Sequence, residues 1–172
     1  MFIFHFLYSS LVSSKSGERV SISRREKVAI SISSKKKNRM TSLENFTSKL
    51  TALVVDDTEI IRKIHQKMLN SLGVKSEGAK NGKEALEIHS YGKKFDLILM
   101  DKDMPIMNGL EATKALRAMG ICSTIVGVSS HSMEEEIVKF MEAGLDEYQE
   151  KPLNKVKLNS ILDKIKHNLM SN

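Results

Sequence analysis

Acidic side chains follow two apolar segments of this 172-residue chain. Asp56 and Asp57 end "LTALVVDD", and Asp101 and Asp103 stand in "LILMDKDMPIMNG". Clustered carboxylates repel one another, and a hard divalent cation such as Mg²⁺, which prefers oxygen ligands, relieves that repulsion. A carboxylate can also act as a nucleophile toward a phosphoryl group. Since a single aspartate after a strand is more often a helix cap, only the combination and spacing of the acids favour a site.

Residues suited to phosphate follow the other apolar segments. Ser129 ends "IVGVSS" and offers a hydroxyl donor, and Lys151 follows "EYQE" as a mobile positive charge. Pro152 follows that lysine, and we expect a cis Lys-Pro bond in the turn. Thr58 and nearby backbone N–H groups begin a helix whose positive end favours anions. The set predicts a site for a phosphoryl group attached to, or leaving, a carboxylate.

The elements that must position these residues alternate between strand and helix. Helical spacing of apolar residues marks four of the helices, and Asn108 with Glu111 caps another. We expect an α/β fold with a doubly wound five-stranded parallel sheet, in which ligands bind outside the carboxyl ends of the strands. The four acids then share one rim. The predicted strands are 50–57, 74–79, 95–100, 123–130 and 146–150, and the helical patterns are 60–72, 81–92, 132–141 and 158–169.

Two helix starts carry more detailed predictions. Asn81 is expected to be an N-cap with Glu84 at the third helical position. Ser132 with Glu135 predicts a capping box for the helix that follows the fourth strand. That helix is expected to be buried through four apolar side chains: Met133, Ile137, Phe140 and Met141.

Composition and charge divide the chain into a tail and a globular domain. Residues 1–40 hold nine Lys/Arg and two Glu, a net charge of +7, whereas residues 41–172 have a net charge of −1. The pI of about 9.3 therefore describes the tail and is poor evidence that the globular part binds nucleic acid. The single cysteine excludes an intramolecular disulfide. We expect residues 1–45 to be a basic, Ser-rich tail and residues 46–172 to be one domain.

The tail has several interpretations. It is disordered, or it is an extension upstream of Met40 as the working start. Its Ser/Arg-rich composition also fits an organelle transit peptide, and "KKKNR" fits a nuclear localisation patch. Its apolar start is too short to span a membrane. The cytoplasm, the nucleus or both are the expected locations, with organelle import as the less favoured one.

The sequence resembles two-component response-regulator receiver domains over about residues 50–170. "LVVDD", "LILMDKDMPIMNG", "IVGVSS" and "EYQEKP" stand in the order of that family. "ILMDKDMPIMNG", "IVGVSS" and "FMEAGLDEYQEKPL" look most like the plant type-C response regulators, which are short receiver-only proteins of the His–Asp phosphorelay. The resemblance implies a flavodoxin-like (βα)5 fold and makes residues 46–172 a receiver domain.

The resemblance also implies a role for each rim residue. Asp101 would be the phosphoacceptor and would attack a phosphohistidine, with Ser129 and Lys151 contacting phosphoryl oxygens. Phosphorylation would draw Ser129 inward and let Tyr148 turn, which makes these two the switch residues. The implied Mg²⁺ ligands are the carboxylates of Asp56, Asp57 and Asp101 and the backbone carbonyl of Asp103.

Two further positions bear on dephosphorylation. Asp103 and His131 lie two residues beyond Asp101 and Ser129, where the family places residues beside the hydrolytic water. They would tune the lifetime of the phosphoryl group, with the sign left open. An exposed loop histidine without a kinetic role is an equal interpretation of His131.

The implied function is a switch in cytokinin-type two-component signalling. The phosphoryl donor would be a histidine phosphotransfer protein or a hybrid histidine kinase, and the receiver a monomer or a weak phosphorylation-dependent dimer. No DNA-binding domain or membrane span is expected.

The alternative is a phosphate sink or phosphohistidine phosphatase that drains the relay, so enzyme activity beyond self-modification stays open. A remoter alternative is a haloacid-dehalogenase-like phosphohydrolase, because "DKD" matches its D-x-D motif; in those enzymes, however, the motif normally closes the first strand.

Overall fold

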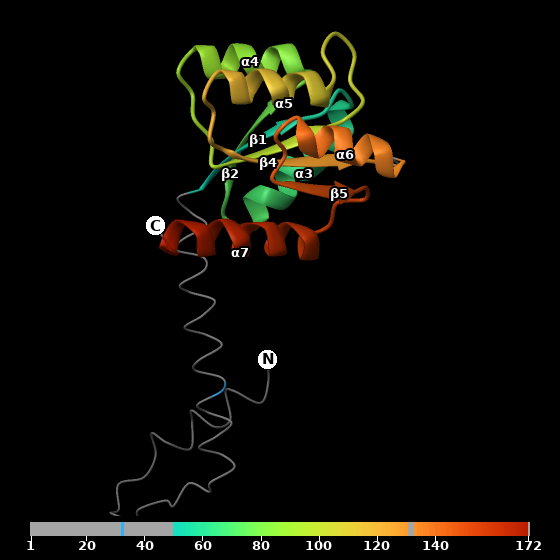
Figure 1. Ribbon diagram of the computed structural model, residues 1–172. Helices are drawn as coiled ribbons and strands as arrows, with labels where there is room; N and C mark the ends of the chain where they lie inside the picture. The colour runs from blue at the N-terminus through green and yellow to red at the C-terminus, as the bar shows by residue number, and fades with distance from the viewer. Residues whose placement is uncertain (1–31, 33–49, 131–132, 172) are drawn as a thin grey trace, which may run out of the picture. The chain divides into compact units, whose positions relative to one another are not determined.

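The computed structural model describes residues 32, 50–130 and 133–171 of the chain. From Thr51 onward, five strands alternate with five helices (Figure 1). The strands are β1 (Thr51–Val55), β2 (Lys75–Ala79), β3 (Leu97–Asp101), β4 (Thr124–Ser129) and β5 (Glu147–Glu150). The helices are α3 (Glu59–Ser71), α4 (Gly82–Ser90), α5 (Gly109–Ala118), α6 (Glu134–Glu142) and α7 (Lys155–Ser171).

All strand pairs are parallel, and the strand order is β2-β1-β3-β4-β5. Helices α3 and α7 cover one face of the sheet, and α4, α5 and α6 cover the other (Figure 1). The predicted doubly wound parallel sheet is therefore confirmed. The chain switches direction between β1 and β3, which places a crevice at the carboxyl ends of these two strands.

Strand β3 is the centre of the core. All five of its residues are buried, and their side chains alternate between the two faces of the sheet. Leu97 and Leu99 pack under α3 and α7, whereas Ile98 and Met100 pack under the other three helices. The edge strands β2 and β5 are only half-buried. A rigid, fully buried strand thus ends in Asp101 and fixes the position of that carboxylate.

Two of the predicted caps are confirmed. The side chain of Asn81 accepts a hydrogen bond of 2.9 Å from the backbone N–H of Glu84. Asn108 accepts one of 2.9 Å from the N–H of Glu111, whose carboxylate accepts one of 3.1 Å from the N–H of Asn108. Asparagine in an extended conformation satisfies a helix-start N–H that the helix itself leaves unpaired, so local sequence alone sets these starts.

The predicted start and buried face of α6 are partly wrong. The helix begins at Glu134, one residue later than a Ser132 cap requires, and Ser132 itself lies outside the described residues. Of the apolar residues expected in the core, only Phe140 is fully buried, while Met133 is 69% exposed and Met141 is 38% exposed. The cause is the orientation of α6, which turns Phe140 into the core and leaves Met133, at the N-cap, outside it.

Some predictions lie outside what the structure describes. They concern the tail, the domain boundary at residue 45 and the position of His131. In the described part of the chain, no helix combines the length and apolarity that a membrane crossing requires.

Candidate functional site

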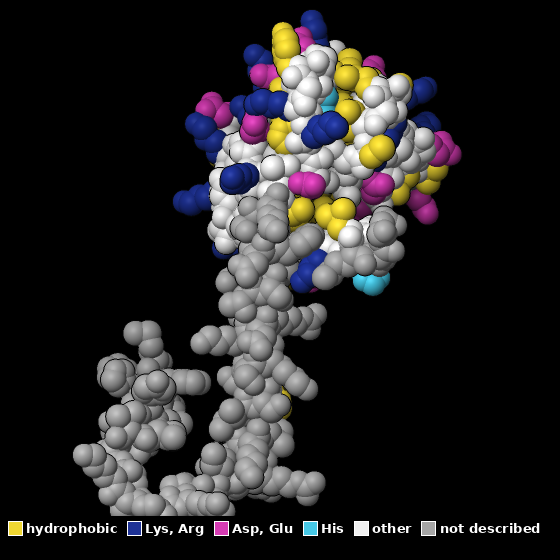
Figure 2. All heavy atoms as spheres, turned by 90° about the vertical axis from the view of Figure 1, so that its left-hand side faces the viewer, with side chains coloured by type: hydrophobic (Ala, Val, Ile, Leu, Met, Phe, Trp, Pro, Cys, Tyr) yellow, Lys and Arg dark blue, Asp and Glu magenta, His cyan; other side chains and the backbone are white. Residues whose placement is uncertain are grey.

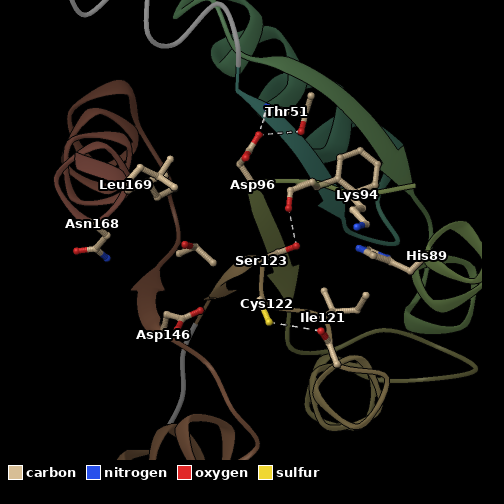
Figure 3. A pocket seen from close by; sticks show the side chains of 14 residues that line it. Thr51, His89, Lys94, Asp96, Ile121, Cys122, Ser123, Asp146, Asn168 and Leu169 are labelled. Carbon is tan, nitrogen blue, oxygen red and sulfur yellow. Dashed lines mark hydrogen bonds between the residues drawn. The ribbon is translucent and has the colours of Figure 1, made fainter. Parts of the chain in front are cut away.

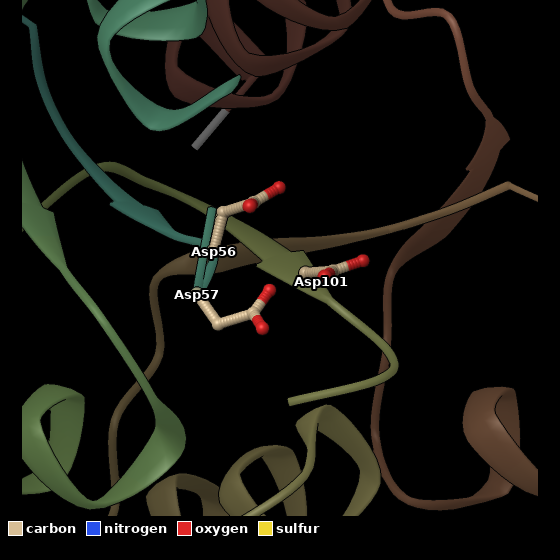
Figure 4. Close-up of side chains that lie close together, drawn as sticks. All are labelled: Asp56, Asp57 and Asp101. Carbon is tan, nitrogen blue, oxygen red and sulfur yellow. The ribbon is translucent and has the colours of Figure 1, made fainter. Parts of the chain in front are cut away.

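Three aspartates meet at the carboxyl ends of β1 and β3. Val55 and Met100 are paired in the sheet, so the residues that follow them, Asp56 and Asp101, leave neighbouring strands at the same level. A carboxylate oxygen from each of Asp56, Asp57 and Asp101 lies within 4.8 Å of the others (Figure 4). Asp56 and Asp101 are buried, at 2% and 6% exposure, whereas Asp57 is exposed. The predicted rim of acids therefore exists, and Asp57 gives it an opening to solvent.

Lys151 supplies the positive charge in the centre of this cluster. Its Nζ lies 2.9 Å from Oδ1 of Asp101 and 3.1 Å from Oδ2 of Asp56. Its backbone N–H donates to the carbonyl of Ser129 at 2.7 Å, which ties the end of β5 to the end of β4. The Lys151–Pro152 peptide bond is cis, as predicted. One ammonium therefore faces two buried carboxylates.

The electrostatics of the pair follow from burial. Burial raises the pKa of Asp101 to about 6, a rise that Lys151 opposes and that Asp56 and Asp57 reinforce. Burial alone would lower the pKa of Lys151, but its hydrogen bonds and charge interactions with Asp101 and Asp56 outweigh burial and raise it. At neutral pH the Asp101 carboxylate is thus mostly ionised, while the lysine stays charged.

The start of α3 contacts carboxylates of the chain itself. The N–H of Thr58 donates to Oδ1 of Asp56 at 2.9 Å, and its hydroxyl lies 3.4 Å from Oδ1 of Asp57. The guanidinium of Arg62 donates to the backbone carbonyl of Asp56. The positive end of α3 therefore holds the aspartates of the site, and the Thr58 N–H is already engaged by a carboxylate.

Ser129 and Tyr148 lie on neighbouring strands. Ser129 is buried at the end of β4, and Tyr148 is partly buried against the core under α4, α5 and α6. In the register of the sheet, Tyr148 faces Gly127, two residues before Ser129. A Cβ added at Gly127 would meet Leu145 at 2.5 Å and Phe140 at 2.9 Å, so the glycine lets these two side chains pack closely against β4.

The side chain of Asp103 is not part of the acid cluster. It is 75% exposed, and its carboxylate lies 3.6 Å from Nζ of Lys102. Its role through the backbone carbonyl stays a prediction, and His131 lies outside the described residues. The structure thus brings together Asp56, Asp57, Asp101 and Lys151 and leaves the Asp103 carboxylate at the surface.

Lys102 lies between two of the predicted metal ligands and was not among the predicted site residues. Its side chain is only 13% exposed and lies 3.0 Å from the carboxylate of Glu136, on α6. A lysine directly between two aspartates signals an ion pair, but its partner is 34 residues away and only the fold reveals it.

The opposite, amino-terminal edge of the sheet also carries carboxylates, around a hollow of about 690 Å³ (Figure 3). Oδ2 of Asp96 accepts hydrogen bonds of 2.8 and 2.9 Å from the N–H and hydroxyl of Thr51. Oδ2 of Asp146 accepts bonds of 2.7 Å from Arg117 and from the N–H of Ile125. Figure 2 shows this side of the molecule with acidic and basic side chains interspersed. Among the described residues, only Asp56, Asp57 and Asp101 form a group of three or more that could hold a metal ion.

The fold and the acid–lysine cluster define a class of protein, and comparison with known families agrees. The sequence model of the response regulator receiver domain matches residues 52–163. This match covers more than half of the chain, so the protein belongs to the response regulator receiver family and is a receiver domain of two-component phosphorelay signalling.

Within this family the chain is similar to plant response regulators. It is 58% identical to two-component response regulator 24 of Arabidopsis thaliana, over 69% of this chain and 85% of that protein. It is 46% identical to two-component response regulator ARR22 of the same plant, over 68% and 84% of the two chains. Among solved structures, CheY4 of Vibrio cholerae matches with a TM-score of 0.63 and 29% identity, over 67% of this chain and 98% of that one. The predicted resemblance to plant receiver-only response regulators is confirmed.

Proposed function

We propose that this receiver accepts a phosphoryl group from a phosphohistidine onto Asp101. The observation that carries the proposal is the contact of 2.9 Å between Asp101 and Lys151, beside two further carboxylates. A structural aspartate at a strand end has no need of this arrangement, since burying several like charges around one lysine is costly. A site that binds a divalent cation and a phosphoryl group recovers that cost.

The donor set fits Mg²⁺. Three carboxylate oxygens within 4.8 Å of one another are hard ligands, and the exposure of Asp57 leaves room for the waters that this ion keeps. When bound, Mg²⁺ would neutralise charge on the phosphoryl oxygens. The residues that would hold it are Asp56, Asp57, Asp101 and the backbone carbonyl of Asp103.

The chemistry of the chain's own residues is mainly positioning. A carboxylate oxygen of Asp101 attacks phosphorus, the P–N bond to the donor imidazole breaks, and its electron pair stays on that nitrogen. Lys151 balances charge on the transferred group, and the Ser129 hydroxyl donates to a phosphoryl oxygen. Because β3 is buried along its whole length, Asp101 is held in place without further ordering.

The switch would use Ser129 and Tyr148. Inward movement of Ser129 toward the phosphoryl group would vacate space at the end of β4, and Tyr148 on the neighbouring strand β5 would rotate into it. The face formed by α6 and β5 would then change, and a partner that prefers one form would read the phosphorylation state. We infer that Tyr148→Ala makes partner affinity independent of phosphorylation, which phosphorylation-dependent pull-down of the partner measures.

The lifetime of the phosphoryl group on Asp101 separates two functions. A long-lived aspartyl phosphate would serve as a switch in cytokinin-type signalling, and rapid release of inorganic phosphate would make the protein a sink that drains the relay. The exposed carboxylate of Asp103 beside the site keeps the sink in consideration, because such a group can orient a hydrolytic water. The haloacid-dehalogenase alternative is not supported. In those enzymes the D-x-D motif normally closes the first strand, whereas here it begins at the end of β3 in a receiver domain.

The test follows radiolabelled phosphoryl groups from a phosphorylated histidine phosphotransfer protein in the presence of Mg²⁺. The wild type should take up the label and Asp101→Asn should not. Asp163→Asn, an exposed aspartate on α7, is the matched control and should behave as the wild type. Absence of transfer to the wild type would refute the proposal, and the half-life of the labelled protein distinguishes the switch from the sink.

A further inference from the structure

Lys102 lies at the junction between the phosphoacceptor strand and the β3–α5 loop. Its backbone N–H donates to the carbonyl of Val128 at 3.3 Å, and its carbonyl accepts from the N–H of Gly109 at 2.9 Å. Its side chain is 13% exposed and reaches across the loop to Glu136 at 3.0 Å. A single residue thus ties the end of β3 to β4, α5 and α6.

Glu136 is the fixed end of this connection. The same carboxylate oxygen that contacts Lys102 also accepts from the N–H of Met133 at 3.2 Å, at the start of α6. The hydrogen bond from Lys102 is the main reason that the pKa of Glu136 is lowered. The ion pair is therefore anchored in the first turn of a helix, where backbone N–H groups also favour a negative charge.

The neighbours of Lys102 make this connection relevant to the metal site. Asp101 and Asp103, which precede and follow it, are two of the four groups assigned above to Mg²⁺. The loop that carries Asp103 includes Ile106, whose φ of 71° is unfavourable for a β-branched side chain. A strained loop keeps one geometry only when several contacts hold it.

We propose that Lys102, through its ion pair with Glu136, is a positioning residue that holds the β3–α5 loop in the geometry that binds Mg²⁺. This inference rests on the proposed function, because it assumes that Asp101 and the Asp103 carbonyl bind the ion. Lys102 does not contact the ion itself. It acts through the loop, as partners behind the direct ligands of a metal commonly do.

Positioning and simple electrostatics predict different signs. If only charge mattered, removing the Lys102 ammonium would tighten Mg²⁺ binding, and removing the Glu136 carboxylate would weaken it. If the ion pair positions the loop, the loss of either partner weakens binding. The direction of the change in Lys102→Met is therefore diagnostic.

The experiment measures Mg²⁺ affinity of the full unphosphorylated chain by calorimetry. We expect Lys102→Met and Glu136→Gln each to weaken binding by about three-fold to tenfold, at or below the low end of losses seen for partners of metal ligands. Lys102→Arg should retain most of the affinity, and the exchange Lys102→Glu with Glu136→Lys should recover it to within about two-fold. The matched controls, Lys114→Met on α5 and Glu135→Gln on α6, carry exposed charges and should leave the affinity unchanged.

Several outcomes would overturn the inference. Tighter Mg²⁺ binding by Lys102→Met together with weaker binding by Glu136→Gln would assign the effect to charge alone. Unchanged Mg²⁺ affinity in both variants would show that the ion pair does not position the loop. Circular dichroism shows whether each variant folds. If Lys102→Met or Glu136→Gln does not fold, the charge exchange and Lys102→Arg decide the question. Weak Mg²⁺ binding by both of these variants would contradict the role of the ion pair. If the wild type binds no Mg²⁺, the proposed function fails instead.

Discussion

The two edges of the sheet carry the same residue type and use it in opposite ways. At the amino-terminal edge, Asp96 and Asp146 each accept two hydrogen bonds from nearby donors, including the backbone at the starts of β1 and β4. At the carboxyl edge, three aspartates face one another, and among the described residues Lys151 is the one ammonium within salt-bridge distance of the two buried carboxylates. The first arrangement stabilises the fold, whereas the second leaves excess negative charge that a bound cation would compensate.

This difference teaches how a structural acid is told from a functional one. Depth of burial does not separate them, because Asp57 at the carboxyl edge is exposed, as Asp146 at the amino-terminal edge is. The partners of each carboxylate separate them. At the amino-terminal edge each aspartate is paired with hydrogen-bond donors, whereas at the carboxyl edge the aspartates are crowded against one another. Substitutions at the two edges are therefore expected to have different effects.

The largest expected effect comes from the two basic residues. Lys151→Met should slow phosphoryl transfer to Asp101 about 10²-fold, because one group that stabilises transition-state charge is lost. Arg117→Met should leave the transfer rate unchanged, although it removes bonds to the carbonyls of Gly144, Ile121 and Ser123 and destabilises the fold. Single-turnover transfer kinetics measure this. Equal rates for Lys151→Met and the wild type would contradict the functional assignment of the carboxyl edge.

The pH dependence of stability should carry the signature of Asp101. Its folded-state pKa of about 6 exceeds the ordinary value of 3.8, so the folded state holds this proton more tightly than the unfolded state does. Its contribution to the free energy of unfolding therefore falls as the pH rises from about 4 to above 6, by up to about 3 kcal/mol. Without Mg²⁺, Asp101→Asn should be more stable than the wild type at pH 7, and this advantage should shrink below pH 5.

Urea unfolding across this pH range checks the prediction. Comparing the variant with the wild type removes the contribution of His65, whose pKa is lowered by burial and which titrates with the opposite sign. A difference in stability that does not vary with pH would show that Asp101 has an ordinary pKa in the fold.

A matched pair of aspartates separates stability from binding. Asp96→Ala leaves the N–H and hydroxyl of Thr51 without their partner and should cost about 1–3 kcal/mol of stability, with no change in Mg²⁺ affinity. Asp57→Ala should leave stability unchanged or raise it, because like-charge repulsion falls, and should abolish most Mg²⁺ binding. Denaturant unfolding and calorimetry measure the two quantities. A large stability loss in Asp57→Ala would make the two edges alike.

The smallest effect concerns the backbone. At the amino-terminal edge, turns with positive φ are occupied by Gly92 and Gly120, whereas the loop beside the site uses Ile106 at φ 71°. Ile106→Gly should raise stability by about 1 kcal/mol, because the strain of a β-branched residue in the left-handed region is removed. Thermal unfolding detects a change of this size. A loss of stability instead would mean that the exposed isoleucine is not strained.

Much of the fold and the site could be predicted from local sequence. The fully apolar run that ends in Asp101 predicts a central strand, and the parallel-sheet rule then places every strand-end acid on one rim. The caps at Asn81 and Asn108 follow from side chains that are close in sequence. These features depend on neighbours within a few residues.

The features that could not be predicted depend on distant parts of the chain. The Lys102–Glu136 ion pair joins residues of different elements, and the buried face of α6 depends on how closely that helix approaches the sheet. Ile60 and Ile64 have the helical spacing of core residues, yet they are 71% and 51% exposed, because α3 turns His65 and Leu69 toward the sheet. Tertiary packing decides which face of an amphipathic helix is buried.

The location of the phosphoryl group tests the central claim most directly. The full chain would be phosphorylated by a phosphohistidine donor with Mg²⁺, reduced with borohydride to convert an aspartyl phosphate to homoserine, and mapped by mass spectrometry. Homoserine is expected at position 101 and at no other aspartate of the rim. Homoserine at position 56, 57 or 103, or a phosphoryl group that stays on another residue type, would contradict it.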